Sequence, residues 1–148
     1  MSFLNLSDVY ASIHKKLRED EVIRQLMGFD ETTTAVDMAV RIQKRMKPST
    51  VIDENLPLIT FYKLPGQRGR NHLEYVTVFD FDIYTNDDVE LAVDIADRIN
   101  YLFDDKFLPL SKGSSFKGQY VTSAEDTTDL ENTYKYFTQV EFTFGIKG

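Results

Sequence analysis

One stretch of the chain, residues 71–103, predicts a strand that runs directly into a helix. In its first part, aromatic and β-branched residues alternate with a period of two, and no proline or glycine interrupts them. Alternate side chains of a strand point to opposite faces. One expected face consists of Tyr75, Thr77, Phe79, Phe81 and Ile83, and the other of Val76, Val78, Asp80, Asp82 and Tyr84. The first face is apolar enough to form part of a core.

The polar residues after this strand predict the start of an amphipathic helix. Asp87 is the expected N-cap, and Glu90 follows three residues later, as in a capping box. The apolar residues that recur with helical spacing are Val89, Ala92, Val93, Ala96, Ile99 and Phe103. Because the strand is half-buried and the helix has one apolar stripe, we expect the helix to lie back on the apolar face of the strand.

The first third of the chain predicts three short helices. We expect the first to extend to residue 19 with Ser7 as its N-cap, the second to cover Glu21–Met27, and the third to cover Ala35–Met46. Gly28 suits the end of the second helix. Their apolar stripes are narrow, so we expect these helices to pack against a sheet formed by later residues.

Three further strands are expected. They cover Leu58–Leu64, Gln119–Ala124 and Tyr134–Ile146, which are rich in aromatic and β-branched residues. A glycine-containing turn at residues 65–70 joins the first of them to the long strand, and an acidic turn at residues 125–132 joins the last two. The element order is therefore three helices, two strands, one helix and two strands.

This order predicts an α+β fold with a four-stranded antiparallel or mixed sheet. The ββαββ core would cover residues 57–148, with helices packed on one face and an N-terminal helical segment in residues 1–50. A chain of 148 residues has the usual length of one domain, so we expect a single domain over residues 1–148.

Composition excludes several classes of protein. The chain has no cysteine, so neither a disulfide framework nor a thiolate site is possible. Its formal net charge of −7 opposes binding to phosphates, and we expect no nucleic-acid sequence recognition. No apolar run approaches the roughly 20 residues that span a membrane, and the start of the chain lacks the pattern of a signal peptide. We therefore expect no membrane association.

Few residues suit catalysis or metal binding. The two histidines, His14 and His72, have neither a nucleophile nor a second ligand at a useful spacing, and His14 is expected on a solvated helix surface. Asp80 and Asp82 share one strand face about 7 Å apart, which is a poor arrangement for a hard cation. We expect them in an exposed or subunit-facing polar patch. The sequence predicts no catalytic residue, no cofactor and no metal site.

Charges of opposite sign gather around the two expected hairpin turns. Lys63, Arg68 and Arg70 make the first turn basic. The second turn is acidic through Glu125, Asp126, Asp129 and Glu131. Solvated polar loops would explain both, but opposite charges on two protrusions also suit a head-to-tail contact between copies of the chain. The candidate subunit or partner contacts are these seven residues together with Asp80 and Asp82.

Both faces of the long strand carry apolar residues, since Val76 and Val78 lie opposite the core set. Sheets that are covered on both faces show that pattern. With helices on one side only, a partner subunit could cover the other side.

Several stretches resemble the tail terminator and tail-completion proteins of long-tailed bacteriophages. The matching stretches are Pro57–Tyr62 (PLITFY), Val76–Tyr84 (VTVFDFDIY), Ala92–Ile99 (AVDIADRI) and the final strand YKYFTQVEFTFGIK. In that family, a proline and an aliphatic strand precede a long aromatic strand, a polar break and a helix of the same type. The resemblance covers most of the chain, while the N-terminal helices are longer than the family pattern.

The resemblance implies a structural virion protein and not an enzyme. In the family, copies of the subunit form a hexameric ring that caps the tail tube, stops its polymerisation and joins the tail to the head connector. The expected partners are therefore further copies of the chain, the tail tube protein and the head connector protein. The expected place is the tail–head junction of particles assembled in the bacterial host cytoplasm.

Two alternatives stay open. The longer N-terminal helices also suit another neck or head–tail connector protein of a phage. A small-molecule-binding regulatory α+β domain could use the same ββαββ layout, although it would need a pocket with convergent polar groups, which the sequence does not show.

Overall fold

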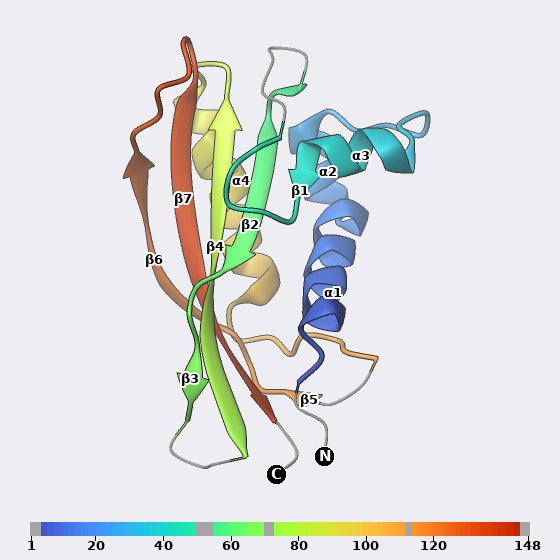
Figure 1. Cartoon of the computed structure of the whole chain (residues 1–148). Helices are drawn as coiled ribbons and strands as arrows, with labels where there is room; N and C mark the ends of the chain where they lie inside the picture. Colours follow the sequence, from blue (N-terminus) through green and yellow to red (C-terminus); the bar gives the residue numbers. More distant parts are fainter. Residues whose placement is uncertain (1–3, 50–54, 70–72, 112–113, 146–148) are drawn as a thin grey trace.

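Two long antiparallel strands form the centre of the sheet. The computed structural model describes residues 4–49, 55–69, 73–111 and 114–145. Strand β4 (Glu74–Thr85) pairs with β7 (Tyr134–Gly145) along its whole length, from Glu74 opposite Gly145 to Thr85 opposite Tyr134. The pair runs through the whole molecule as one twisted ribbon (Figure 1). The predicted long strand is thus confirmed, as is the last strand within the described residues.

Five shorter strands flank this ribbon in the described parts of the chain. At one end, β2 (Leu58–Lys63) pairs antiparallel with β4, and β6 (Gln119–Asp126) pairs antiparallel with β7. At the other end, the two-residue strands β3 (Gln67–Arg68) and β5 (Ser114–Ser115) lie beside β4 and β7. The last of the five, β1 (Ile42–Gln43), pairs parallel with β2 and makes the sheet mixed.

The α+β class is confirmed, while the prediction of a four-stranded sheet is only partly right. The four longer strands match it, but the structure adds three strands of two residues each. Two residues are too few to show a period-two pattern in a sequence. The acidic turn also begins later than predicted, because Glu125 and Asp126 still pair with β7 as part of β6.

Four helices are described: α1 (Leu6–Glu19), α2 (Glu21–Met27), α3 (Ala35–Arg41) and α4 (Val89–Phe103). The residue before each helix has a side-chain oxygen that accepts a hydrogen bond from a backbone N–H of the first turn. α2 has the predicted bounds and ends at Gly28, whose φ of 76° is that of a left-handed C-cap. None of the helices within the described ranges is long and apolar enough to cross a bilayer.

Two of the N-caps differ from the prediction. Asn5 caps α1 in place of Ser7, and its side chain accepts a hydrogen bond from the backbone N–H of Asp8. In α4 the cap is Asp88 and not Asp87, whose φ of 52° is left-handed and takes it out of the capping position. Neighbouring capping residues compete at such positions, so a sequence fixes a helix start only within a residue or two.

Helix α3 ends at Arg41, five residues before the predicted end at Met46. Ile42 leaves the helix, pairs with Ile59 of β2 and buries its side chain in the core. Met46 is exposed. The helical spacing that joins Ile42 to Met46 in the sequence is therefore not used, because burial of Ile42 against the sheet stabilises the chain more than another helical turn would.

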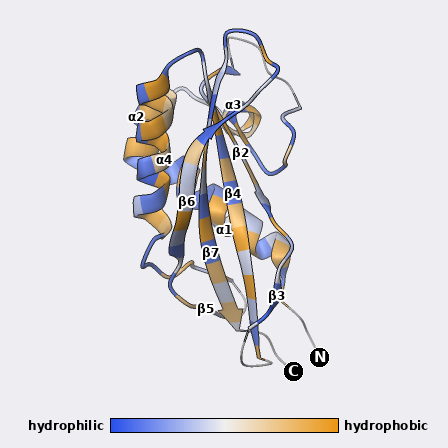
Figure 2. Ribbon diagram, turned by 90° about the vertical axis from the view of Figure 1, so that its left-hand side faces the viewer, coloured by the Kyte–Doolittle hydropathy of each residue, from blue (hydrophilic) through white to orange (hydrophobic). Residues whose placement is uncertain are grey.

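The core lies between the sheet and α1, α2 and α4, which cover one face of it (Figure 2). Six fully buried phenylalanines form its centre, namely Phe61, Phe79, Phe81, Phe103, Phe142 and Phe144. Neighbouring rings among them lie 5.6–6.5 Å apart between centroids. Tyr10 of α1 packs edge-on against Phe79 at 5.2 Å. The predicted core face of β4 and the docking of α4 on it are confirmed.

The opposite face of β4 is buried in part by the chain itself. Residues 44–49, which follow β1, cross this face of the sheet (Figure 1). Asp80 and Asp82 are only 4% and 3% exposed, and Tyr84 is also buried. Only the half-buried Val76 and Val78 match the expectation of a face left for a partner. The expectation that Asp80 and Asp82 form an exposed patch is wrong, since both side chains are buried within the chain. The expectation that they face another subunit stays a prediction.

Candidate functional site

The structure separates the residues predicted to make the first hairpin turn basic. Lys63 is half-buried, and its ammonium group donates to the Leu64 carbonyl and to the Tyr75 hydroxyl, both at 3.0 Å. Its charge is therefore held between the end of β2 and the neighbouring strand β4. Arg68 is exposed in β3, opposite Tyr75 of β4. Arg70 lies outside the described residues, as does His72.

The acidic residues stay together and are exposed. Glu125 and Asp126 end β6, and Asp129 and Glu131 lie in the turn that leads to β7. Asp126 forms an ion pair of 3.1 Å with Lys135, whose hydrogen bond lowers the pKa of Asp126. In the described part of the chain, Asp129 and Glu131 have no side-chain ion pair. This edge of the sheet thus presents uncompensated negative charge.

Behind this edge lies a buried polar cluster that the sequence does not predict. Asp80 accepts a hydrogen bond of 3.0 Å from the Gln139 amide, and Lys135 lies 3.6 Å from Asp82. The second carboxylate oxygen of Asp80 and the hydroxyl of Thr60 are buried without a hydrogen-bond partner among the described residues. No group of three or more metal-ligating side chains occurs in those residues. The cluster therefore provides buried charge without a ligand set for a cation.

Burial changes the protonation of this cluster. Burial, together with the neighbouring Asp80 carboxylate, raises the pKa of Asp82 to about 8, so Asp82 holds a proton at neutral pH. Burial and the charge of Asp80 raise the pKa of Tyr62 to about 12. Burial alone would lower the pKa of Lys135, but the hydrogen bond to Asp126 and the neighbouring acidic groups together outweigh it and raise that pKa. The cluster is thus a neutral acid beside a firmly charged lysine.

His14 is buried and fully bonded, contrary to the prediction of a solvated side chain. Its Nδ1 lies 3.0 Å from the Arg18 guanidinium, which can only donate, so Nδ1 must accept. Its Nε2 then carries the proton and donates to the Ile42 carbonyl at 3.0 Å. Burial lowers the pKa of His14. Both ring nitrogens are occupied, so His14 ties α1 to β1 and is not placed to act as a base.

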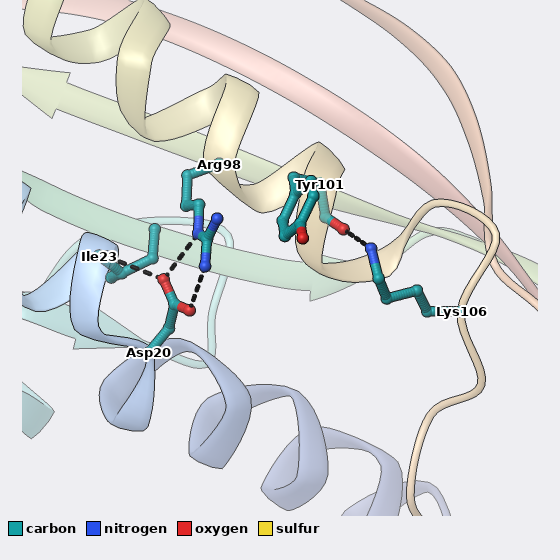
Figure 3. A network of polar contacts seen from close by, with 5 residues as sticks. All are labelled: Asp20, Ile23, Arg98, Tyr101 and Lys106. Atoms are coloured by element: carbon teal, nitrogen blue, oxygen red, sulfur yellow. Dashed lines mark hydrogen bonds and ion pairs between the residues drawn. The ribbon is translucent and has the colours of Figure 1, made fainter.

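Another polar contact, between Asp20 and Arg98, holds α2 on α4 (Figure 3). Asp20 caps α2 by accepting from the Ile23 N–H, and the same carboxylate accepts two hydrogen bonds from Arg98 at 2.9 and 2.8 Å. The Arg98 guanidinium also lies 4.5 Å from the centre of the Tyr101 ring. Hydrogen bonding from Arg98 lowers the pKa of Asp20. One carboxylate therefore both starts α2 and holds it on α4.

A double-mutant cycle should show this coupling as about 1–2 kcal/mol between Asp20 and Arg98. We expect Asp20→Ala to lower the free energy of unfolding by about 1 kcal/mol more than Arg98→Ala does, since Asp20→Ala also removes the cap. Urea unfolding of the two single variants and the double variant measures both values. The matched control is the exposed pair Asp105 and Lys117, 3.4 Å apart, for which we expect a coupling below about 0.5 kcal/mol. Equal couplings for the two pairs would contradict the assignment.

Two of the hollows on the described surface are large enough to consider as ligand sites. The first, of about 540 Å³, lies between residues 46–48 and the turn at residues 127–130, with Tyr84 and Lys135 among its lining residues. The second, of about 790 Å³, follows α1 and is lined in part by Lys15, Lys16 and Lys44. Their sizes fall in the range of small-molecule sites. Size alone therefore leaves the regulatory-domain alternative open, although Lys135 already bonds to Asp126.

Together these features describe a small α+β protein with one helix-covered sheet face, an exposed acidic strand edge and a histidine engaged in structure. No protein-family model matches the sequence, and no curated protein matches it. Among solved structures, the fold is similar to that of a chain in a structure described as "Virion of native gene transfer agent (GTA) particle". The TM-score is 0.67 at 14% sequence identity, over 99% of this chain and 100% of that chain. The two chains therefore share a fold over nearly their whole lengths.

Proposed function

We propose that this chain is a structural protein of a tailed, phage-like particle and that it acts as a tail terminator. Copies of the chain form a ring, hexameric in the family that the sequence resembles, which caps the tail tube and stops its polymerisation. The other side of the ring meets the head connector. The chain therefore acts by recognition and makes or breaks no bond. Its place is the tail–head junction of a particle assembled in a bacterial cytoplasm.

The observation that supports this proposal most directly is the likeness to a chain of a virion-like particle. That likeness spans both chains almost completely, so it does not depend on one common motif. The resemblance of PLITFY, VTVFDFDIY and AVDIADRI to tail terminators points the same way. In the structure these stretches are β2, β4 and α4, which together form the centre of the core.

Electron microscopy of particles produced without this chain tests the role. A terminator predicts tails of uncontrolled, greater length, because nothing ends polymerisation of the tube. A neck or connector protein predicts tails of normal length that are not joined to heads. Adding the purified chain to growing tubes should then restore a uniform length. Tubes and heads that form and join normally without the chain would contradict both roles and favour the regulatory domain.

A further inference from the structure

The strands of this sheet place an acidic edge and a basic segment at the same position along the strand direction. One cross-strand row runs from Ile42 of β1 through Ile59, Ile83 and Tyr136 to Glu125 of β6. β1 and β6 lie at opposite edges of that half of the sheet (Figure 1). Neighbouring strands are about 4.8 Å apart, so the two ends of the row are roughly 20 Å from each other.

One end of the row continues into a purely basic segment. Residues 41–47 contain Arg41, Lys44, Arg45 and Lys47 and no acidic residue. Arg41 is bonded to the carbonyls of Met27 and Pro57. Lys44, Arg45 and Lys47 are exposed and take part in none of the ion pairs between described residues. We define Lys44 and Arg45, which directly follow β1, as the basic segment, because Lys47 already lies beside the acidic turn.

The other end of the row is purely acidic and belongs to an open strand edge. Residues 119–132 contain four acidic residues and no basic one. β6 pairs only with β7 among the described strands, and nearly all of its residues are exposed. Tyr120 and Val121 add exposed apolar surface to it. We define Glu125, Asp126, Asp129 and Glu131 with this strand as the acidic edge.

The basic segment does not neutralise the acidic edge within one chain. Lys47, which lies outside the basic segment, lines the same hollow as Asp129, but no ion pair of 4.0 Å or less joins Lys44, Arg45 or Lys47 to the acidic edge in the described residues. One subunit therefore carries opposite charges on its two edges, at the same position along the strands. These edges are complementary when a second copy lies beside the first with its sheet at the same height.

Arg68 does not fit such a level contact. It lies opposite Tyr75, eight residues along β4 from Ile83 in the row above. At about 3.3 Å per residue, this places Arg68 roughly 26 Å along the sheet from the acidic edge. A contact between Arg68 and the acidic edge would require neighbouring copies to be shifted by that distance.

We infer that the acidic edge of one copy binds the basic segment of the next copy. The ring then closes through head-to-tail contacts between neighbouring sheets that lie at the same height. This inference rests on the proposed ring and names the two surfaces that build it. The partner at both surfaces is a second copy of this chain. Each copy uses one surface of each sign, as a closed ring requires.

Two charge-reversed variants test the inference, because each has surfaces of one sign only. Lys44→Glu with Arg45→Glu makes both surfaces acidic, and Glu125→Lys, Asp129→Lys and Glu131→Lys together make both basic in net charge. Each variant alone should associate at least about tenfold more weakly than the wild type. An equimolar mixture should recover association, since each surface then meets its opposite in an alternating ring. Sedimentation at low salt, and electron microscopy with cross-linking on tail tubes, measure both effects.

Two further variants serve as controls. Asp94→Lys with Asp97→Lys reverses two exposed acids on α4 and should leave association unchanged. Arg68→Glu should also leave it unchanged; loss of association there, with no effect at Lys44 and Arg45, would overturn the inference in favour of a shifted contact. Circular dichroism and thermal melts confirm that each variant is folded.

The outcomes separate this inference from the proposed function. A wild type that forms rings while both variants associate normally, or a mixture that does not recover, overturns the inference and leaves the tail terminator role standing. A wild type that forms no assembly in solution or on tubes, and does not limit tube length, overturns both.

Discussion

Replacing Phe81 by alanine is expected to lower the free energy of unfolding by about 3–5 kcal/mol. The Phe81 side chain is fully buried and stacks on Phe61 at 5.7 Å and on Phe103 at 5.6 Å. It thereby joins β2, β4 and α4. Its removal loses both the apolar burial and two ring contacts, and it leaves a cavity that the sheet backbone cannot collapse to fill.

Urea unfolding of Phe81→Ala and Phe81→Leu measures this effect, and the leucine variant should lose less because it keeps most of the volume. Phe107→Ala is the matched control. Phe107 is 62% exposed, so its removal should change the free energy of unfolding by no more than about 0.5 kcal/mol. A loss at Phe81 as small as that at Phe107 would show that the aromatic core does not carry the stability.

The second large effect is a dependence of stability on pH that comes from Asp82. Its pKa is about 8 in the folded chain against an ordinary value of 3.8. The folded state therefore binds more protons than the unfolded state between these two values, and stability should fall as pH rises from about 4 to about 8. Each unit of pKa difference corresponds to about 1.4 kcal/mol, so the loss should amount to a few kcal/mol.

Asp82→Asn should remove most of this loss, because the amide has no proton to release. The measurement is the free energy of unfolding at pH 5, 7 and 9 for the wild type and the variant. The variant should be the more stable of the two at pH 9. Asp126→Asn is the control with the opposite sign: the pKa of Asp126 is lowered, so its contribution is lost only as pH falls below about 4, and a further measurement at pH 3 tests it. A wild type with equal stability at pH 5 and pH 9 would contradict the protonation of Asp82.

The central part of the fold is predictable because two strong periodic patterns are adjacent in the sequence. The period-two alternation of Thr77, Phe79, Phe81 and Ile83 defines both a strand and its buried face. The helical stripe that follows shows where α4 docks. In these stretches local pattern and tertiary burial agree, so neither has to override the other. The same agreement gives the bounds of α2, where Gly28 takes the left-handed conformation of a helix end.

The remaining differences arise where a tertiary contact decides and leaves no local signal. Ile42 continues the helical spacing of α3, yet it belongs to β1 because it pairs with Ile59 at the edge of β2. His14 lies among charged neighbours in the sequence, yet the Ile42 carbonyl and Arg18 enclose it. Both residues depend on β1, a strand of two residues that no periodicity can show.

The candidate contact residues divide in the same way. The acidic cluster at Glu125, Asp126, Asp129 and Glu131 is local in sequence and remains a cluster on the surface. Asp80 and Asp82 are buried beside residues that are distant in sequence: Gln139 donates a hydrogen bond to Asp80, and Lys135 lies 3.6 Å from Asp82. The basic surface at the level of the acidic edge depends on the parallel pairing of β1 with β2, so it becomes visible only once the strands are in register.

The double use of Asp20 has a consequence for how the chain unfolds. A helix of seven residues such as α2 is too short to persist in water by itself. The Asp20 carboxylate both caps the first turn of α2 and accepts the hydrogen bonds of Arg98. We therefore expect that α2 cannot separate from α4 without fraying at its first turn. Amide hydrogen exchange should therefore show the N–H groups of α2 opening cooperatively with those of α4, as one foldon, and not as an independently melting N-terminal unit.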